Sequence, residues 1–498
     1  MDNFLDVSAS WSIFECMFDC EFSGADDATV VAAIEDCARA EAVAAARRLS
    51  AIAELKHRRV GTDEDDPRVF WACDPWDSAA AEVAAAMNIS ARKASGQMRI
   101  AAALRDRLRS VAALFARGEL SARVVGAITW RTQFITDEAV WALIDRAIAK
   151  RAVRWGPLSE ERLITAVDAL VLEFDPAALM VSKTVVRSRD FVVGDIEDEY
   201  GMTAVWGRLS AADAAALKNK IAAMVATVCD NDPRSANERR AAAMGAWSHG
   251  NDHLPCACES ANCPAREEHP APTSSVIINV YTDQATLDTA QKGTESAAAP
   301  ATPTPASSGT ALLSGTEVMP TPLLAELLRN GAKLRPLCTP DEKPEPQYRP
   351  SATLARFVRA RDLTCRFPGC TAPAESCDID HVIPYPAGAT HPSNLACLCR
   401  KHHHLKTFWT GDWQLTLQSD GAAVWTSPTG QTYTTYPGSR SFFPDWDTST
   451  GELPPPTTAQ TFSTDRGVMM PLRKRTRTQD REARIKAERE QNSDPPPF

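Results

Sequence analysis

The chain has 498 residues, enough for roughly two or three domains with hydrophobic cores of their own. Hydrophobic residues make up 44% and charged residues 24% of it, as in soluble globular proteins. The formal net charge of −10 excludes a global positive field, so contacts with nucleic acid would have to use local basic patches. The sequence lacks both a long apolar run and the basic flank of a secretory signal. We therefore expect a cytoplasmic protein, without a membrane partner, whose cysteines stay reduced.

Residues 25–290 predict a mainly helical domain with a small α+β insert. The first part of this domain, about residues 25–178, is rich in Ala, and its hydrophobic residues recur with the period of a helix. A β-rich segment at about 183–210, with a turn at Tyr200-Gly201, and a strand at 274–282 supply the β part. Helices of the first part are expected at 78–87, 91–117, 121–131, 137–150 and 159–173.

Residues 82–98 resemble a helix-turn-helix. Asn88 can adopt a left-handed turn there, and Ser90 can cap the second helix. Such a motif could dock on DNA. An ordinary helical hairpin within a bundle is the alternative interpretation of the same pattern.

A group of metal-ligating residue types follows within the same domain. His253, Cys256, Cys258 and Cys263 could bind a zinc ion, and such a site would hold a loop in place rather than catalyse a reaction. The spacings are irregular and the intervening chain is short. The pattern is therefore compatible with a zinc site and with no site at all.

Three segments with different compositions follow the helical domain. Residues 291–325 are low in complexity and rich in Pro, Ala, Ser and Thr, which predicts a flexible linker. Residues 345–437 predict a compact domain rich in metal ligands. Residues 450–498 are Pro-rich and then basic, which predicts a disordered tail apart from a short helix.

The compact domain concentrates five of the chain's nine histidines and five of its fourteen cysteines within residues 365–404. Cys365 and Cys370 form one pair, and Cys399 and His402 form another. Two such pairs can meet around a tetrahedral zinc ion and join two loops of a small fold. The alternative is that the cysteines are small buried hydrophobic residues. Two further cysteines are close enough in sequence to compete as ligands: Cys377 and Cys397.

Between these pairs lies a group suited to acid–base chemistry. Asp380 can hold a hard divalent cation, and His381, with an ordinary pKa near neutrality, can take a proton from water. Asn394 and His403 complete a minimal site for one Mg²⁺ or Mn²⁺ ion that touches a scissile phosphate. The alternative is that Asp380 and His381 only support the zinc ligands.

In order and spacing, these residues resemble the motif of the His-Asn-His (HNH) endonucleases, whose domain is the ββα-metal or His-Me finger. The segments CRFPGC and LCRKHHHLK resemble the zinc-stabilised subclass of that family. The resemblance implies that His381 is the general base and that Asp380 and His403 bind the catalytic metal. It also implies that Asn394 fixes the loop or joins the metal and that Lys406 contacts phosphate. The structural zinc would be held by Cys365, Cys370, Cys399 and His402.

The sequence departs from the family pattern at two points, and its ligand register is open at a third. His402 stands where the fourth zinc ligand is often Cys, and Gly388-Ala389 stands where Gly-Gly is usual. The run of three histidines at 402–404 leaves the ligand register open by one residue.

The order of the whole chain is similar to that of actinobacterial HNH proteins in which a long helical domain of unknown function precedes the finger. The segments 232–244 and 359–370 carry this likeness. The expected fold class is a mainly α N-terminal domain with a small α+β insert, a linker, a small zinc-stabilised ββα-metal (HNH) finger and a disordered tail.

The expected function is the hydrolysis of DNA phosphodiester bonds by a single-metal mechanism. The expected cofactors are structural Zn²⁺ and catalytic Mg²⁺ or another divalent cation, and the expected partner is DNA. The alternative, from a different class, is a non-catalytic zinc-stabilised module that binds DNA or another protein.

Overall fold

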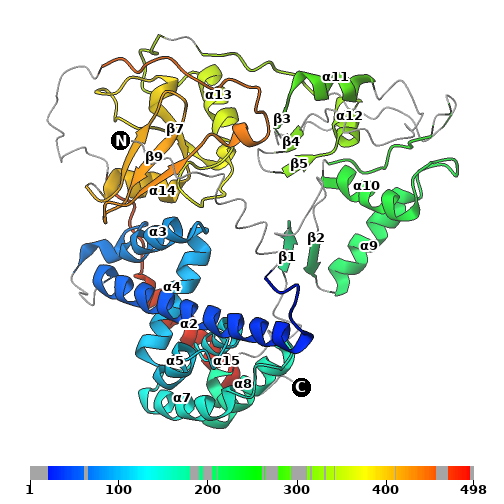
Figure 1. Ribbon diagram of the computed structural model, residues 1–498. Coiled ribbons are helices and arrows are strands. Elements are labelled where there is room, and N and C mark those ends of the chain that lie inside the picture. Colours follow the sequence, from blue (N-terminus) through cyan, green and yellow to red (C-terminus); the bar gives the residue numbers. More distant parts are fainter. Residues whose placement is uncertain are drawn as a thin grey trace.

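The computed structural model of the protein is mainly helical, with small sheets of two or three strands (Figure 1). This confirms the mainly helical character and the small β part of the expected fold. No helix among the described residues combines the length and the apolar character that a membrane span requires. The described residues are 21–60, 66–179, 190–194, 205–209, 211–248, 250–258, 260, 263, 279–292, 311–313, 317–329, 332–340, 343–409, 411–455 and 469–493.

The helical domain, residues 21–179, is organised by one long helix, α2 (Asp27–Val60), which lies against the next three α-helices. Those and the remaining elements of the domain are η1 (Pro67–Phe70), α3 (Pro75–Met87), α4 (Ala91–Asp106), α5 (Arg109–Ala116), α6 (Ala122–Arg131), α7 (Glu138–Ala152), α8 (Glu160–Phe174) and η2 (Pro176–Ala178).

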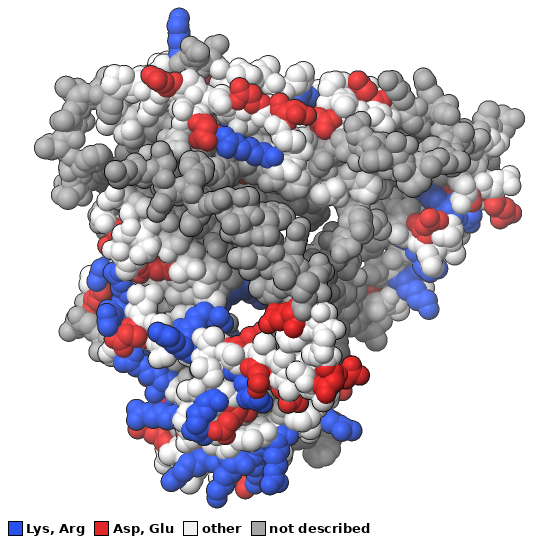
Figure 2. All heavy atoms as spheres, viewed as in Figure 1, with Lys and Arg blue, Asp and Glu red and all other residues white. Residues whose placement is uncertain are grey.

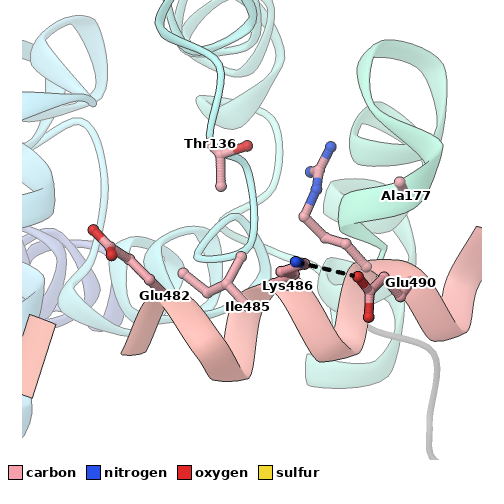
Figure 3. Close-up of a pocket in the computed structure, with 7 residues that line it drawn as sticks. Thr136, Ala177, Glu482, Ile485, Lys486 and Glu490 are labelled. Atoms are coloured by element: carbon pink, nitrogen blue, oxygen red, sulfur yellow. Dashed lines mark ion pairs between the residues drawn. The ribbon is translucent and has the colours of Figure 1, made fainter. Parts of the chain in front are cut away.

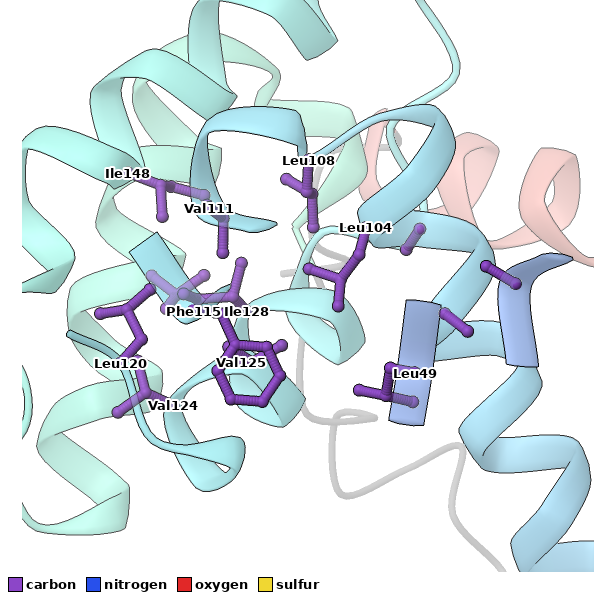
Figure 4. Close-up of a cluster of buried hydrophobic side chains, with 14 of the residues drawn as sticks. Leu49, Leu104, Leu108, Val111, Phe115, Leu120, Val124, Val125, Ile128 and Ile148 are labelled. Carbon is purple, nitrogen blue, oxygen red and sulfur yellow. The ribbon is translucent and has the colours of Figure 1, made fainter. Parts of the chain in front are cut away.

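The core of the helical domain lies where these helices converge. Leu49 of α2, Leu104 of α4, Phe115 of α5 and Ile128 of α6 are buried together (Figure 4). Many of the surrounding buried positions are Ala, and such small side chains allow helix axes to approach closely. Burial of this apolar surface is the main stabilising contribution to the domain.

The single helix expected at 91–117 is wrong, because the chain breaks between α4 and α5. Leu108 leaves the helical conformation with φ −114° and ψ 53°, and its side chain is fully buried. The carboxylate of Asp145, on α7, accepts hydrogen bonds from the backbone N–H groups of Ser110 (2.8 Å) and Val111 (3.1 Å). A residue distant in sequence thus caps the start of α5, and this contact favours two helices over one.

The turn expected within 82–98 is confirmed. Asn88 has φ 50° and ψ 43°, in the left-handed region, and the Ser90 hydroxyl accepts a hydrogen bond from the backbone N–H of Lys93 (3.3 Å). On α3, Ala81 and Ala85 are buried in a second hydrophobic cluster that they share with the C-terminal part of the chain. The α3–α4 pair is therefore a helical hairpin that is covered on both sides of its first helix.

The middle region, residues 190–329, contains the expected β-rich insert. Strands β1 (Asp190–Val193) and β2 (Val205–Arg208) pair antiparallel, with Val192 opposite Trp206, and the turn predicted between them lies outside the described residues. The remaining elements are α9 (Ala211–Val225), α10 (Ala236–Ser248), β3 (Val280–Thr282), α11 (Gln284–Lys292), β4 (Ala311–Leu313), β5 (Glu317–Met319) and α12 (Thr321–Arg329).

The linker expected at 291–325 is wrong over its second half. Strands β4 and β5 pair antiparallel and complete a three-stranded sheet with β3, and α12 follows at once. Ala311 and Leu312 are fully buried, and Ala311 packs with Leu324 of α12. Short apolar runs thus bring this segment into a small core, although its composition resembles that of a linker. Residues 293–310 of the expected linker lie outside the described residues.

The C-terminal unit, residues 343–455, contains two small antiparallel sheets. Asp420-Gly421 lies in the turn between β8 and β9, with Gly421 at φ 82°. Trp409, Trp413 and Trp425 are buried as expected of core residues. The elements are α13 (Ala352–Asp362), η4 (Ala374–Ser376), β6 (Asp378–His381), η5 (Pro392–Asn394), β7 (Leu395–Leu398), α14 (Arg400–Phe408), β8 (Gln414–Leu417), β9 (Ala423–Thr426), β10 (Thr432–Thr435) and η6 (Gly438–Ser441).

The helix expected within the tail at 450–498 is present as α15 (Arg477–Ser493), and residues 456–468 and 494–498 of the expected tail lie outside the described residues. This helix of 17 residues returns to the helical domain and lies alongside its helices (Figure 1). Arg489 donates a hydrogen bond to the Asp175 carboxylate (2.7 Å), and the Asn492 side chain donates to the backbone carbonyls of Ala177 and Leu179. These partners are some 310 residues away in the sequence, so composition alone did not indicate them.

Candidate functional site

The site is built on a β-hairpin that is followed by a helix. Strand β6 pairs antiparallel with β7, with Asp380 opposite Ala396 and His381 opposite Leu395. Asn394 lies before β7 and not in the helix, because all four residues of β7 are buried in this ladder and α14 begins only at Arg400. Cys399 consequently occupies the N-cap of α14.

The two predicted ligand pairs meet in space. The ligand atoms of Cys365, Cys370, Cys399 and His402 all lie within 4.8 Å of one another. Nδ1 of His402 is 3.4 Å from Sγ of Cys365 and 3.3 Å from Sγ of Cys399, and the Sγ atoms of Cys370 and Cys399 are 4.0 Å apart. A tetrahedral zinc ion with bonds of about 2.1–2.3 Å would separate its ligand atoms by roughly 3.5–3.8 Å. The group can therefore hold a metal ion with little adjustment.

Aromatic packing positions the imidazole of this group. The Phe367 ring stacks on the ring of His402, with centroids 3.9 Å apart, and Trp413 and Trp425 pack edge-on against Phe367. Nδ1 of His402 is thereby directed at the sulfur atoms. The two competing cysteines lie outside the group, with thiols near backbone carbonyls: Cys377 near Ala372 and Cys397 near Val358.

The next histidine belongs to a different cluster. Nε2 of His403 is 3.5 Å from Oδ1 of Asp380, and Nδ1 of His403 is 2.8 Å from Oδ2 of Asp378. The structure thus assigns the register that the sequence left open, with His402 beside the cysteines and His403 beside the carboxylates. Asp378 was missed in the sequence, although its spacing of two residues from Asp380 places both on one face of a strand.

Lys406 contacts the same cluster. Its Nζ donates hydrogen bonds to Oδ2 of Asp380 (2.7 Å) and to the backbone carbonyl of His381 (2.6 Å). A cation is thus already placed at the end of α14, one helical turn from His403.

The side chain of His381 is held in one orientation by Thr390. Nε2 of His381 is 2.9 Å from the Thr390 hydroxyl, which itself donates to the backbone carbonyl of Gln347 (2.6 Å). Since a hydroxyl has one proton to give and a carbonyl can only accept, the Thr390 oxygen must accept from Nε2–H of His381. Nδ1 of His381 is therefore the nitrogen that carries the free lone pair.

Burial also changes the pKa of the His381 imidazole. His381 is 4% exposed, and this burial lowers its pKa, an effect that the nearby Asp380 charge opposes. The ring of Tyr348 stacks on His381 with centroids 5.3 Å apart, and Tyr348 itself is 60% exposed. The imidazole is thus neutral near pH 7 and able to accept a proton.

Asn394 fixes the loop between the two strands. Its Oδ1 accepts from the backbone N–H of Ile383 (2.8 Å), and its Nδ2 donates to the carbonyls of Ile383 and Ala389 (both 2.9 Å). A Cβ added to Gly388 would lie 2.6 Å from Nδ2 of Asn394, so the first glycine of the expected Gly-Gly pair is needed here. Of the two roles considered for Asn394, the contacts match loop fixation.

A second cluster forms in the middle region, but its membership differs from the prediction. Cys256, Cys258 and Cys263 lie together with Cys229, and the four ligand atoms are within 4.8 Å of one another. His253 is not in this group, so the ligand set predicted from the sequence is wrong at that position. Cys229 was missed because it lies 27 residues before Cys256 and in another loop.

The pocket drawn in Figure 3 is remote from both clusters. It runs along α15, where Ile485, Lys486 and Glu490 lie near Thr136 and Ala177. Its lining contains neither Cys nor His, and Lys486 pairs with Glu490 at 3.8 Å. The lining of this pocket therefore offers no soft metal ligand.

Fold and site together define a mainly helical protein that carries groups of Cys and His residues able to hold metal ions. The chain belongs to the family described as domain of unknown function DUF222, whose model matches residues 36–362. That match ends with α13, so the Cys365 group lies beyond it.

Relatives extend the likeness over nearly the whole chain. The uncharacterized protein Rv3776 of Mycobacterium tuberculosis is 51% identical over 487 residues, which cover 96% of this chain and 93% of that protein. The uncharacterized protein Rv2100 of the same organism is 50% identical over 494 residues, which cover 95% and 89%. No solved structure matches the chain.

Proposed function

We propose that the protein is an HNH-type endonuclease that hydrolyses DNA phosphodiester bonds with its C-terminal unit. The observation that carries the proposal is the approach of Asp380 and His403 to one another on the β6–β7–α14 arrangement, with His381 as the next residue of β6. Oδ1 of Asp380 and Nε2 of His403 lie 3.5 Å apart, and next to Asp380 the neutral His381 has a free Nδ1. The order of this hairpin and helix supports the proposal, because a ββα-metal finger would have the same order of elements.

Each of these side chains has a separate role in the proposed reaction. His381 accepts a proton at Nδ1 from the attacking water, a role for which its lowered pKa keeps it unprotonated. Lys406 exchanges part of its contact with Asp380 for a phosphate oxygen of the substrate. Asp380 and His403 would hold the divalent cation, and their mixed oxygen and nitrogen donors suit Mn²⁺ or Ni²⁺ as well as Mg²⁺. Such a cation supplies charge stabilisation at the phosphate when it is bound.

The Cys365 group is proposed to hold structural zinc. Its four protein ligands fill a tetrahedral site and leave no open position for a substrate, as is typical of structural rather than catalytic zinc. Such a thiol site is compatible with a reducing compartment, and we place the activity in the cytoplasm.

Two surface features bear on substrate binding. Figure 2 shows Lys and Arg side chains gathered over the helical domain in the lower part of the view, despite the negative net charge of the chain. On the C-terminal unit, Arg356 and Arg400 are exposed. Tyr348 stacks on the ring of His381 and covers one face of this base.

The test is plasmid nicking by the purified full chain with Mg²⁺, Mn²⁺ or Ni²⁺, run beside His381→Ala. We expect the wild type to cut, and we expect His381→Ala to fold normally and to lose at least about a hundredfold in rate, the usual contribution of a general base. His404→Ala is the matched control, because His404 belongs to the same run but to neither cluster.

Two results would overturn the proposal. One is a wild type that retains DNA without cutting it under any of these cations, which would favour the non-catalytic binding module. The other is a His381→Ala variant that cuts as fast as the wild type.

A further inference from the structure

We propose that Cys229, Cys256, Cys258 and Cys263 form a second structural zinc site, which joins the loop after α9 to the loop after α10. This site is independent of the nuclease proposal, because it lies in the middle region and shares no residue with the C-terminal unit. It also replaces His253, the fourth ligand that the sequence suggested, with a cysteine.

The sulfur atoms already have the arrangement that a tetrathiolate ion requires. All four Sγ atoms lie within 4.8 Å of one another, and those of Cys229 and Cys256 are 3.5 Å apart. This distance of 3.5 Å is close to the roughly 3.8 Å that separates two sulfur ligands of a tetrahedral zinc ion with bonds of about 2.3 Å. It is well beyond the disulfide bond length of about 2.05 Å. Cys256 and Cys258 are 8% and 4% exposed, so their thiol groups are largely withdrawn from solvent.

A network centred on Asp232 holds the same two loops together. Its Oδ2 accepts from the backbone N–H of Ala257 (2.9 Å) and from the Arg234 guanidinium (2.7 Å), and Arg234 also donates to the carbonyl of Pro255 (2.7 Å). The Thr227 hydroxyl contacts the carbonyl of Leu254 (3.3 Å). The network therefore fixes the backbone on both sides of the ligands and presets the positions of their sulfur atoms.

The hydrophobic core around this site is too small to hold the two loops in a fixed conformation. Among the described residues, the cluster between α9 and α10 contains three buried hydrophobic side chains: Met224, Ala243 and Leu254. Small units with such cores are usually stabilised by a metal or by disulfides. Four soft thiolates in a closed tetrahedron select zinc, and the absence of an oxygen donor disfavours Mg²⁺ and Ca²⁺.

The test is the zinc content of the full chain, measured by plasma mass spectrometry after purification under reducing conditions. We expect Cys229→Ser and Cys258→Ser each to bind one zinc ion fewer per chain than the wild type. His253→Ala is the control, and it should retain the wild-type content because His253 lies outside the group. The comparison is a difference, so it does not depend on whether the C-terminal unit also binds zinc.

A second measurement, made on the wild type, tests the proposal if a Ser variant fails to fold. In the wild type, a zinc chelator should make the segment from α9 to Cys263 sensitive to protease, and added zinc should restore its protection. The proposal is overturned if the Ser variants keep the wild-type zinc content, if His253→Ala loses a zinc ion, or if the bound metal is iron. It is also overturned if thiol titration of the unreduced wild type shows these cysteines oxidised.

Discussion

At the scale of single residues, Thr390 determines which nitrogen of His381 can act as a base. Its hydroxyl is fully buried and is shared between Nε2 of His381 and the carbonyl of Gln347. Thr390 touches neither the proposed metal ligands nor the surface. It is a positioning residue, and its effect on catalysis would be transmitted through the imidazole alone.

Thr390→Val tests this role, because Val has nearly the same shape but cannot accept a hydrogen bond. We expect the nicking rate to fall by roughly ten- to a hundredfold, as is usual when a residue that orients a catalytic group is lost. Thr390→Ser keeps the hydroxyl and should restore most of the rate. A Val variant that cuts as fast as the wild type would show that the tautomer of His381 is not controlled here.

Single residues also show which metal ligands could be predicted from the sequence and which could not. Cys365, Cys370, Cys399 and His402 were predicted from spacing, because each pair is local and the two pairs bracket a short domain. The ligands predicted for the second cluster were wrong at one position. Cys229 joins this cluster through the packing of α9 on α10 rather than through a local spacing in the sequence. Local pairs can be read from a sequence, whereas ligands brought in by tertiary packing cannot.

At the scale of elements, the same distinction separates correct from incorrect expectations. The turn at Asn88 depends on nearby residues, and it is where the sequence predicts it. The break before α5 depends on Asp145 from another helix, and α15 depends on carboxylates far away in the sequence. The break before α5 and the docking of α15 were therefore not predicted, because both are determined by tertiary contacts.

The docking of the C-terminal segment relies on two buried carboxylates. Asp74 and Asp77 are 3% and 4% exposed. Arg477 donates to Asp74 (2.9 Å) and to Asp77 (2.8 Å), and Arg473 donates to Asp77 (3.0 Å). Asp77 also accepts from Lys401 of α14 at 2.9 Å. One pair of acids thus binds the tail, the helical domain and the C-terminal unit together.

We expect Arg477→Ala to lower the free energy of unfolding by about 3 kcal/mol, because it leaves buried charges with fewer partners. Urea denaturation followed by circular dichroism measures this loss. Arg475→Ala is the matched control, since Arg475 is exposed on the same segment, and its effect should stay within about 0.5 kcal/mol. Equal unfolding midpoints for the two variants would show that α15 contributes little to stability.

At the scale of the whole molecule, the C-terminal unit is not an independent appendage. Trp409 donates from its indole nitrogen to the carbonyl of Cys73 (3.0 Å), and Cys73 shares the hydrophobic cluster of the C-terminal unit. The loop between Cys365 and Cys370 also lies against the turn after α3, where Gly369 meets the backbone of Ile89. The helical domain therefore positions the loop that carries two proposed zinc ligands.

Gly369 is a point of close backbone approach in this interface. A Cβ at this position would lie 2.5 Å from the carbonyl oxygen of Ile89, and Gly369 also has φ 71°, which L residues rarely adopt. Gly369→Ala should therefore push the C-terminal unit away from α3. Gly430→Ala is the matched control, because Gly430 has a similar φ of 81° but nothing within 4 Å of the added Cβ.

We expect calorimetry to show one main unfolding transition for the wild type and for Gly430→Ala, the latter shifted down by the backbone strain of roughly 1–3 kcal/mol. Gly369→Ala should show a larger shift and a separate, earlier transition for the C-terminal unit, because its contact with the helical domain is broken while its own core is unchanged. A Gly369→Ala profile that overlays that of Gly430→Ala would mean that the interface absorbs the added methyl group, and that the two units unfold together for another reason.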